Sequence, residues 1–255
     1  MTKKFFPTLG DSVVARPRLN TKATAGLDRY QVLTRYLADR KFIDLVGTSS
    51  LRFARLRLLL KNDPDEGRIA TSAYLDASAM VDPPNGMPRD QNAYLEFLKV
   101  GPHEQAYISC WYMGGPDSDR MWGEYVPDGE GVAASTTVGQ LLDCFDGDDG
   151  IKVASLAPIR YIKPDADMPA LMDRDNFVAA LQYKGDNFKH ENEMRAIILY
   201  NTYYISGVLP IFGERLPIVN DAFINSIRIA PNATDKYQTH VRNVLENTPL
   251  EKRIG

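Results

Sequence analysis

The sequence predicts a single α+β domain over residues 27–255, with a mostly antiparallel or mixed sheet and flanking helices. Three observations support this fold class. The 255 residues are 44% hydrophobic and 25% charged, so the chain can bury a sizeable core. Short β-favouring runs are interspersed with segments of helical spacing along the chain. No internal repeat or Gly/Ser-rich linker divides it, and the turn-rich residues 1–26 are expected to be an irregular lead-in.

The first half of the chain is expected to begin with a strand at 31–36, because QVLTRY is rich in β-favouring residues. A helix follows at 38–46, where apolar residues recur with helical spacing, and Gly47 is expected to end it. Apolar residues at 51–56 indicate a second strand or extended segment. The Pro- and Gly-rich segment 76–93 is interpreted as a surface excursion after a short helix.

The second half alternates in the same way. Apolar or β-branched runs bounded by turn residues predict the remaining strands, at 106–111, 131–137, 152–162, 194–200, 203–208 and 224–229. Helical spacing predicts the remaining helices, at 138–145, 168–182 and 234–246. The apolar run 194–199 places its strand at the centre of the sheet.

Charge and targeting signals limit the partners. A formal net charge of −3 provides no basic field, which disfavours nucleic acid as a partner, although a local basic patch is compatible with it. Cys110 and Cys144 do not make a disulfide framework in a chain this long. No apolar run is long enough to span a membrane, and the first residues lack the apolar core of a secretory signal. We therefore expect a cytoplasmic protein that does not associate with membranes.

The most informative segment carries two carboxylates and an arginine at the start of a predicted strand. Glu191, Glu193 and Arg195 stand at alternate positions, so all three would point to one face of a strand. Acidic residues are depleted in strands, and two on one face repel each other unless they are solvated or engaged. The segment therefore predicts a functional centre, while a solvated strand end with Glu193 and Arg195 simply paired is the alternative.

Two further features could contact a ligand. Trp111 and Trp122 flank a Gly-Gly-Pro-Asp-Ser turn and could wall a pocket for a flat ring, or both could be core residues. Arg35, followed by Tyr36 at the end of the first predicted strand, could clamp a phosphate bidentately or merely cap the sheet.

Other chemistries are poorly supported. The turn 62–67 holds three carboxylates, but its spacing fits no EF-hand loop and an Asx-type turn is the simpler interpretation. The three histidines lack metal-ligand spacing, so no metal is expected, and Cys110 is typical of an inert core thiol. The sequence has no G-x-S-x-G, Walker or G-x-G-x-x-G motif, which argues against α/β-hydrolases, P-loop enzymes and Rossmann dehydrogenases.

Taken together, five motifs over about residues 30–250 resemble a bacterial family classified only as a domain of unknown function. The motifs are N-D-P-x-E, S-C-W followed by M-W, a G-V-A strand ending in hydroxyl residues, F-x-x-E-x-E-x-R-A-I and I-x-x-I-x-I-A-P-N-A, and they fall within 48–67, 109–122, 131–137, 188–197 and 224–233. Tyr112 stands where the family has His, and Asp117 where it has Glu.

A second, more distant resemblance is to ADP-ribosyltransferases of the Arg–Ser–Glu type. Those enzymes carry an arginine on an early strand, a Ser-Thr-Ser strand, and a Glu-x-Glu pair at the start of a later strand. Arg35, the Ser-Thr-Thr at 135–137 and the Glu-Asn-Glu at 191–193 occur here in the same order. About a hundred residues separate the first two motifs, which requires an insertion, and Ser49-Ser50 could fill the serine role instead. The resemblance implies an ADP-ribosyltransferase-like fold.

The same resemblance implies NAD as the substrate. The arginine would hold the pyrophosphate, hydroxyls would fix the loop under the nicotinamide ribose, and the last glutamate would hydrogen-bond a ribose hydroxyl. The first glutamate would orient or deprotonate the acceptor. The implied catalytic residues are Glu193, Glu191 and Arg35. The residues implied to contact NAD are Arg35, Tyr36, Trp111, Trp122, Ser135 and Thr136.

The leading hypothesis is therefore an NAD-dependent ADP-ribosyltransferase-like enzyme, in the role of a toxin or a phage-defence effector. Its acceptor, a macromolecule or a small molecule, is not defined by the sequence. One alternative is a metal-dependent nuclease or phosphodiesterase that uses Asp63, Glu66, Glu191 and Glu193 as oxygen ligands for Mg²⁺. The other is a non-catalytic ligand-sensing module whose two tryptophans form the pocket.

Overall fold

The computed structural model describes residues 16–61, 104–145, 147, 149–163, 179–200, 209–218 and 222–255. Its strands are β1 (Pro17–Leu19), β2 (Val32–Ala38), β3 (Ser50–Arg55), β4 (Ala106–Met113), β5 (Gly131–Thr137), β6 (Asp149–Pro158), β7 (Arg160–Ile162), β8 (Tyr183–Gly185), β9 (Glu193–Tyr200), β10 (Glu214–Pro217) and β11 (Ser226–Ile229). Its α-helices are α1 (Thr21–Thr24), α2 (Asp39–Thr48), α5 (Asp119–Tyr125), α6 (Val138–Asp143) and α7 (Asp235–Leu245). Short 3-10 segments are η1 (Leu56–Lys61), η2 (Ala179–Gln182), η3 (Asp186–Glu191) and η5 (Glu251–Arg253).

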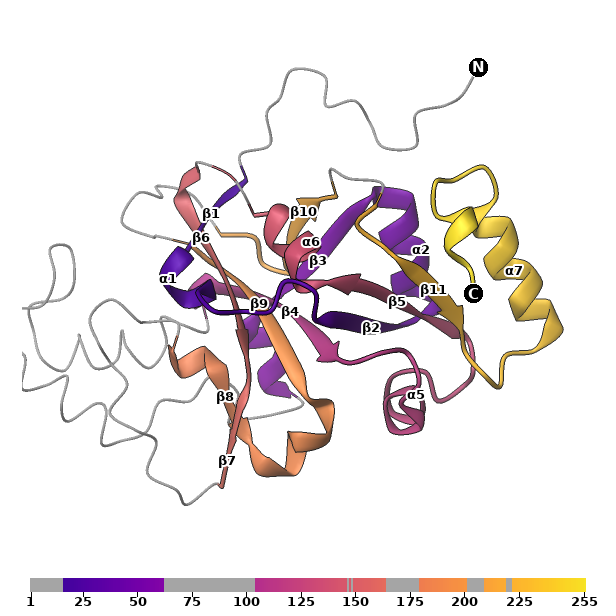
Figure 1. The fold of residues 1–255 in the computed structure, drawn as a ribbon, viewed down its shortest axis with the longest axis horizontal. Helices are drawn as coiled ribbons and strands as arrows, with labels where there is room; N and C mark the ends of the chain where they lie inside the picture. Colours follow the sequence, from indigo (N-terminus) through magenta and orange to yellow (C-terminus); the bar gives the residue numbers. More distant parts are fainter. Residues whose placement is uncertain are drawn as a thin grey trace, which may run out of the picture.

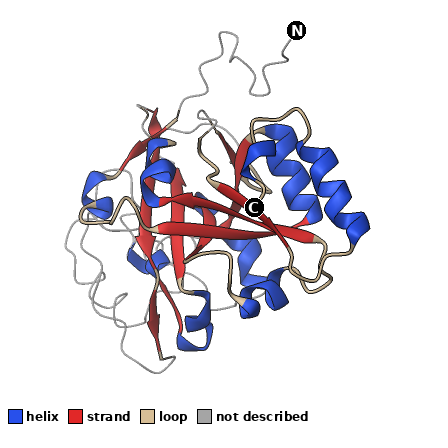
Figure 2. Ribbon diagram, turned by 45° about the vertical axis from the view of Figure 1, so that its right-hand side comes forward, coloured by secondary structure: helices blue, strands red, loops and turns tan. Residues whose placement is uncertain are grey.

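Most strands join one mixed sheet, in the order β1-β6-β9-β4-β2-β5-β11, seen in Figure 1 and, by element type, in Figure 2. All these pairings are antiparallel except β1 with β6. β9 lies between β4 and β6, and nearly all of its residues are buried. An apolar run suits such a position because both faces of the strand are covered. The sheet with its helices is a single α+β domain, as predicted.

The two faces of the sheet are covered by different elements. Alternate residues of β2 point to opposite faces, so Leu33 and Leu37 enter the main core while Tyr36 enters a separate cluster. Helices α2, α6 and α7 supply apolar side chains to the main core, and α7 lies beside α2 (Figure 1). α5 covers the other face, where its Met121 and Trp122 pack with Tyr36.

The sheet forks along one edge of β4. β2 pairs with the end of β4, through Leu33–Met113 and Thr34–Tyr112. β3 pairs with its beginning, through Ala54–Ile108 and Arg55–Tyr107, and then diverges to pair with β10. Residues 109–111 of β4 therefore lie at the fork, between the two strands.

Most of the predicted elements that fall on described residues are confirmed. Gly47 does not end the helix: α2 runs to Thr48, and Ser49 adopts the left-handed conformation (φ 46°). Part of the expected irregular lead-in forms β1 and α1, and helix α5 was not predicted. In the predicted helix 168–182 the described end, Ala179–Gln182, is a 3-10 turn. The excursion 76–93, the helix portion 168–178 and the strand 203–208 lie outside the described residues.

The described residues also bear on two further expectations, about disulfide bonds and about helices that span a membrane. Neither Cys110 nor Cys144 forms a disulfide bond. In the part of the chain that the structure describes, no helix has the length and apolar character needed to cross a membrane.

Alanine substitutions at two glycines are expected to change the free energy of unfolding in opposite directions. A Cβ at Gly131 would lie 2.5 Å from the Leu37 carbonyl oxygen and 2.7 Å from Val126 Cγ1, whereas a Cβ at Gly47 meets nothing within 4 Å. Gly131→Ala is expected to destabilise the protein by ~1–3 kcal/mol through overpacking. Gly47→Ala is expected to stabilise it by up to ~1 kcal/mol, because Ala favours the helical backbone. Urea unfolding of both variants measures the difference, and a Gly131→Ala protein as stable as wild type would contradict the packing described.

Candidate functional site

The two carboxylates of the Glu-x-Glu motif lie close together but come from different elements. Glu191 is the last residue of η3, and Glu193 is the first of β9. Between them Asn192 adopts the left-handed conformation (φ 37°) and donates its side-chain amide to the Met113 carbonyl oxygen at 2.7 Å. The expected strand parity therefore holds for Glu193 and Arg195 but not for Glu191.

Glu193 and Arg195 form a buried ion pair. Arg195 donates from Nε to Glu193 Oε1 at 2.8 Å and from Nη2 to Oε2 at 3.1 Å, and from Nη1 to the Leu181 carbonyl oxygen at 2.9 Å. Arg195 is 0% and Glu193 2% exposed. The pairing of these two side chains is thus confirmed, but the solvated strand end in which the alternative placed it is not, because both side chains are buried. Because both Glu193 oxygens are engaged inside the protein, the expected role of Glu193 as a substrate-contacting carboxylate is not supported by this geometry.

The electrostatics of Glu193 reflect this pairing. Burial by itself raises the pKa of Glu193, but the charge and hydrogen bonds of Arg195, with smaller effects of Lys184 and the Cys110 thiol, lower it to about 2. Tyr161 Oη accepts a hydrogen bond from the Glu193 backbone N–H at 2.8 Å. Burial, opposed by this hydrogen bond, raises the pKa of Tyr161 to about 12. The group is therefore an ionised carboxylate surrounded by donors.

Lys184 connects the two carboxylates. Its Nζ lies 2.6 Å from Glu191 Oε2 and 3.7 Å from Glu193 Oε2, and 4.5 Å from the centroid of the Phe188 ring. Tyr125 Oη donates to Glu191 Oε1 at 3.3 Å. Burial first, and then the charge of Glu191, raises the pKa of Tyr125 well above its ordinary value, which keeps this hydroxyl protonated as a donor. Glu191 is thereby held as an oriented anion.

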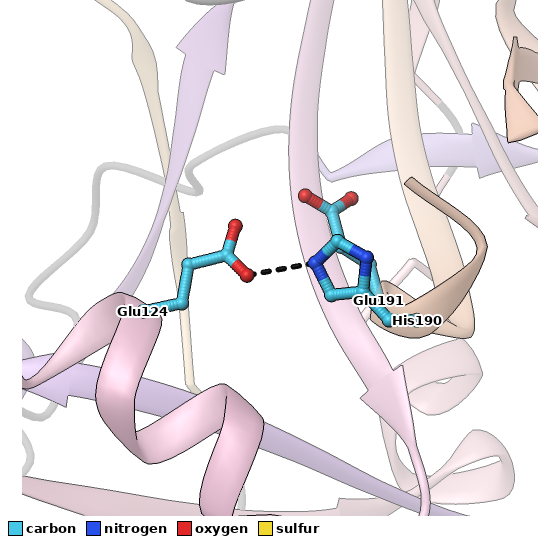
Figure 3. Close-up of side chains that lie close together, drawn as sticks. All are labelled: Glu124, His190 and Glu191. Atoms are coloured by element: carbon cyan, nitrogen blue, oxygen red, sulfur yellow. Dashed lines mark hydrogen bonds and ion pairs between the residues drawn. The ribbon is translucent and has the colours of Figure 1, made fainter. Parts of the chain in front are cut away.

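A histidine and a third carboxylate lie next to Glu191. His190 Nε2 is 2.7 Å from Glu124 Oε2, and Figure 3 shows the imidazole facing this carboxylate with Glu191 beside it. One possible ligand atom from each of the three residues lies within 4.8 Å of the others. Glu124 comes from α5 and the other two from the end of η3. In the described residues this is the group whose composition suits a metal ion.

A second cluster, of three cations, lies at the fork of the sheet. The Arg35 guanidinium carbon is 5.8 Å from the centroid of the Trp111 ring, and Arg35 Nη1 donates to the Arg52 carbonyl oxygen at 3.4 Å. Burial lowers the pKa of Arg35, and the charge of Arg52 lowers it further, with the Cys110 thiol acting in the opposite direction. Burial, followed by the charges of Arg35 and Arg52, lowers the pKa of Lys41. We call Arg35, Lys41 and Arg52 the cation cluster.

The cation cluster has no carboxylate partner in the described part of the chain. The ion pairs found there join other cations, such as Arg29 with Asp143 and Arg55 with Glu104. Arg35 is half-buried, whereas Lys41 and Arg52 are exposed, so solvent partly screens the repulsion among the three charges. An anion bound among them would offset the rest.

The structure does not place Arg35 and Glu193 on one face of the sheet. Register pairs Thr34 with Tyr112, and Tyr112 with Glu193, so these three side chains share a face. Arg35 follows Thr34 directly in β2 and points to the opposite face. The side chains of Arg35 and Glu193 therefore lie on opposite faces of the sheet.

The predicted hydroxyl and tyrosine contacts are used within the protein. Ser135 Oγ is 2.9 Å from Thr34 Oγ1, and Thr136 donates to the Phe223 carbonyl oxygen at 2.6 Å. Tyr36 is 5% exposed and donates to the Gly115 carbonyl oxygen at 3.3 Å. Their burial and internal hydrogen bonds leave none of them open to a nicotinamide ribose, contrary to the expectation.

The two tryptophans do not wall one pocket. Trp111 is 2% exposed in the main core, and its Nε1 donates to Ser109 Oγ at 3.1 Å. Trp122 is 6% exposed in the cluster on the other face, and its Nε1 donates to the Pro116 carbonyl oxygen at 2.8 Å. The pocket expected for the ligand-sensing hypothesis is therefore not formed by this pair, although Trp111 does contact Arg35.

The structure describes only two of the four acidic residues that the nuclease hypothesis assigns as Mg²⁺ ligands. Asp63 and Glu66 lie outside the described residues, and Glu193 is engaged by Arg195.

Comparison of the chain with protein-family models, with curated proteins and with solved structures found no match. The two family resemblances stated above therefore stay predictions.

Proposed function

We propose that this protein is an NAD-consuming, ADP-ribosyltransferase-like enzyme that binds the pyrophosphate of NAD on the cation cluster. The observation that carries the proposal is the cluster itself: Arg35, Lys41 and Arg52 have no carboxylate partner among the described residues, and the half-buried position of Arg35 disfavours its charged form, while Lys41 and Arg52 are exposed. A pyrophosphate supplies the missing negative charge, and the planar fork of an arginine matches two phosphate oxygens.

The order of strands supports a single NAD site that includes both the cation cluster and the Glu-x-Glu motif. β9, β4, β2 and β5, which carry the Glu-x-Glu motif, the fork, Arg35 and the Ser-Thr-Thr motif, are consecutive in the sheet. The Cys110 thiol interacts electrostatically with Arg35 on one side and with Tyr125 and Glu193 on the other. Both clusters therefore lie near the same part of β4, with Arg35 on one face of the sheet and Glu193 on the other. In this proposal the pyrophosphate binds at the fork and the nicotinamide ribose extends toward Glu191.

Glu191 takes the catalytic role that Glu193 cannot fill. Nicotinamide leaves from C1′ of the ribose with the bonding electrons, and a cationic oxocarbenium-like state develops at that carbon. The Glu191 carboxylate, oriented by Lys184 and Tyr125, stabilises this charge electrostatically. An acceptor nucleophile, or water, then attacks C1′ and loses a proton. The acceptor and the role as a toxin or phage-defence effector stay predictions.

A nicotinamide-release assay on the purified full chain tests the reaction. Glu191→Gln is expected to lower the rate by ~10²–10³-fold, because the amide keeps the shape but removes the charge at the cationic transition state. Glu104→Gln, which removes a carboxylate paired with Arg55 outside the centre, is the matched control and is expected to keep full activity.

The possible outcomes separate binding from catalysis. Wild type that binds NAD without releasing nicotinamide, under any acceptor condition, would retain the phosphate site and contradict the transferase reaction. Full activity of Glu191→Gln would contradict the role given to this carboxylate. Wild type that binds neither NAD nor pyrophosphate would contradict the proposal altogether.

A further inference from the structure

His190 is oriented in the way that metal-binding histidines are oriented. Its Nδ1 lies 3.2 Å from the carbonyl oxygen of Asn187, one turn earlier in η3. A carbonyl oxygen only accepts hydrogen bonds, so Nδ1 is the protonated nitrogen of this contact. In the neutral imidazole, Nε2 then carries a lone pair and no proton. A backbone carbonyl that fixes the tautomer of the ring in this way is a common companion of histidine ligands.

The lone pair of Nε2 faces a carboxylate. Glu124 Oε2 lies 2.7 Å from His190 Nε2, which is the distance of a charge-assisted hydrogen bond (Figure 3). Two acceptors this close repel each other. A metal ion bonded to both would remove this repulsion, with the two atoms somewhat farther apart than they are here.

A third donor is available beside this pair. Glu191 is 7% exposed and is fixed by Lys184 at one oxygen and by Tyr125 at the other. A carboxylate offers about four lone pairs, so these two donors leave positions for a further ligand bond. Lys184 also offsets one of the two negative charges of the group. The three donor atoms therefore come from a buried, oriented carboxylate, an oriented imidazole and the more exposed carboxylate of Glu124.

We propose that Glu124, His190 and Glu191 bind one divalent transition-metal ion of the Zn²⁺ class. The imidazole favours Zn²⁺ or Co²⁺ over Mg²⁺, which prefers oxygen ligands and water, and Zn²⁺ also accepts carboxylate ligands. With bonds of about 2.0–2.2 Å, tetrahedral ligand atoms lie ~3.4 Å apart. Glu124 Oε2 and His190 Nε2, 2.7 Å apart, therefore need to separate slightly, and the three donors, all within 4.8 Å of one another, need only small movements. Glu124, whose side chain is 39% exposed, has the freedom to rotate inward. The fourth position remains open to water or a substrate.

The proposal does not rest on the transferase reaction, and a metal ion bound to Glu191 would oppose the role that this carboxylate has there. The proposed metal site links α5 to the end of η3. Co²⁺ is the direct probe of this site, because its visible absorption reports the coordination geometry. Full-length protein freed of metal by chelator dialysis is titrated with Co²⁺, and Zn²⁺ stoichiometry is measured by equilibrium dialysis. Wild type is expected to bind one ion per chain, and Zn²⁺ is expected to displace Co²⁺. Long-range ¹H–¹⁵N NMR is expected to show the Nε2 resonance of His190 shifting on Zn²⁺ binding while Nδ1 keeps its proton.

Matched variants assign the site. His190→Ala and Glu124→Gln are each expected to weaken binding at least ~10-fold, within the range seen when metal-site residues and their supporting partners are removed. The control is His240→Ala: His240 Nε2 also contacts a carboxylate, Asp39, at 3.1 Å, but no third ligand completes a group there in the described residues. Binding equal to wild type in both site variants, loss of binding in His240→Ala alone, or no binding by wild type would each overturn the proposal. An additional near-ultraviolet thiolate charge-transfer band would also overturn it, because it would assign the metal to a cysteine.

Discussion

Arg195→Met is expected to destabilise the folded protein by about 3–5 kcal/mol, because it removes one partner of a fully buried ion pair. Among the residues that the structure describes, Glu193, 2% exposed, would then retain only Lys184 at 3.7 Å as a cationic neighbour. Glu193→Gln is expected to destabilise as well, since Arg195 would keep its charge at a site of 0% exposure. This differs from the catalytic role that the resemblance to ADP-ribosyltransferases implied for Glu193.

The double variant Glu193→Leu/Arg195→Met is the control for this pair. Replacing both charged groups by apolar ones removes the attraction and the desolvation cost together, so its stability is expected to be equal to or above that of wild type. Urea unfolding of the two single variants and the double variant gives the coupling energy directly. Single variants as stable as wild type would contradict the burial of an essential pair.

The same pair predicts a pH dependence. The pKa of Glu193 is about 2 in the folded protein, against 4.5 as its ordinary value. A group whose pKa is lower in the folded state stabilises the protein above its unfolded pKa, and this contribution is lost as the pH falls from about 4.5 toward 2. The loss is of the order of 3 kcal/mol. In the double variant this part of the pH dependence is expected to be absent from unfolding curves measured across that range.

Arg35 is expected to behave in the opposite way from Arg195. Arg35→Met removes one of three mutually repelling cations that have no carboxylate partner in the described structure, so it is expected to stabilise the ligand-free protein by ~0.5–2 kcal/mol. The lost contact with the Trp111 ring reduces this gain by ~0.5–1 kcal/mol. The same variant is expected to lose phosphate binding. A stabilising change that removes binding is typical of residues retained for function rather than for stability.

Thermal melts of wild type and Arg35→Met, with and without pyrophosphate, measure both effects. Pyrophosphate is expected to raise the melting temperature of wild type and not that of the variant, because a ligand stabilises only the state that binds it. Arg35→Lys is expected to give an intermediate shift, since an ammonium keeps the charge without the bidentate fork. Strong destabilisation of ligand-free Arg35→Met would instead assign Arg35 to the core.

The longer strands could be predicted because their signals are local, whereas the short strands β1, β8 and β10 were not predicted. The apolar run that became β9 and the β-favouring residues of β2 and β5 are visible without any tertiary information. Helix α5 was missed because a Gly-Gly-Pro turn precedes it and Gly123 interrupts it. The signal that could have found it is Ser118, which accepts a hydrogen bond from the Met121 backbone N–H as the N-cap.

The candidate site was predictable only in part. The sequence indicated Glu191, Glu193, Arg195 and Arg35, and the pairing of Glu193 with Arg195 followed from strand parity. The left-handed Asn192 takes Glu191 out of the strand, and parity within one segment does not reveal such a turn. The face on which Arg35 lies depends on the register of β2 with β4. Tertiary contacts alone bring Lys184 and Tyr125 to Glu191, and they alone bring Lys41 and Arg52 to Arg35. No motif in the sequence indicated these four residues.

The most direct test of the central claim is a calorimetric titration of NAD into wild type, Arg35→Gln and Arg29→Gln. Arg29 is an arginine paired with Asp143 away from the cation cluster, and it serves as the matched control. Arg35→Gln is expected to weaken NAD binding by ~10–100-fold, the loss of about 1.5–3 kcal/mol from hydrogen bonds to a charged group. Arg29→Gln is expected to bind like wild type, and inorganic pyrophosphate to compete with NAD. Equal NAD affinity in wild type and Arg35→Gln, or no competition by pyrophosphate, would contradict the assignment of the cation cluster as the pyrophosphate site.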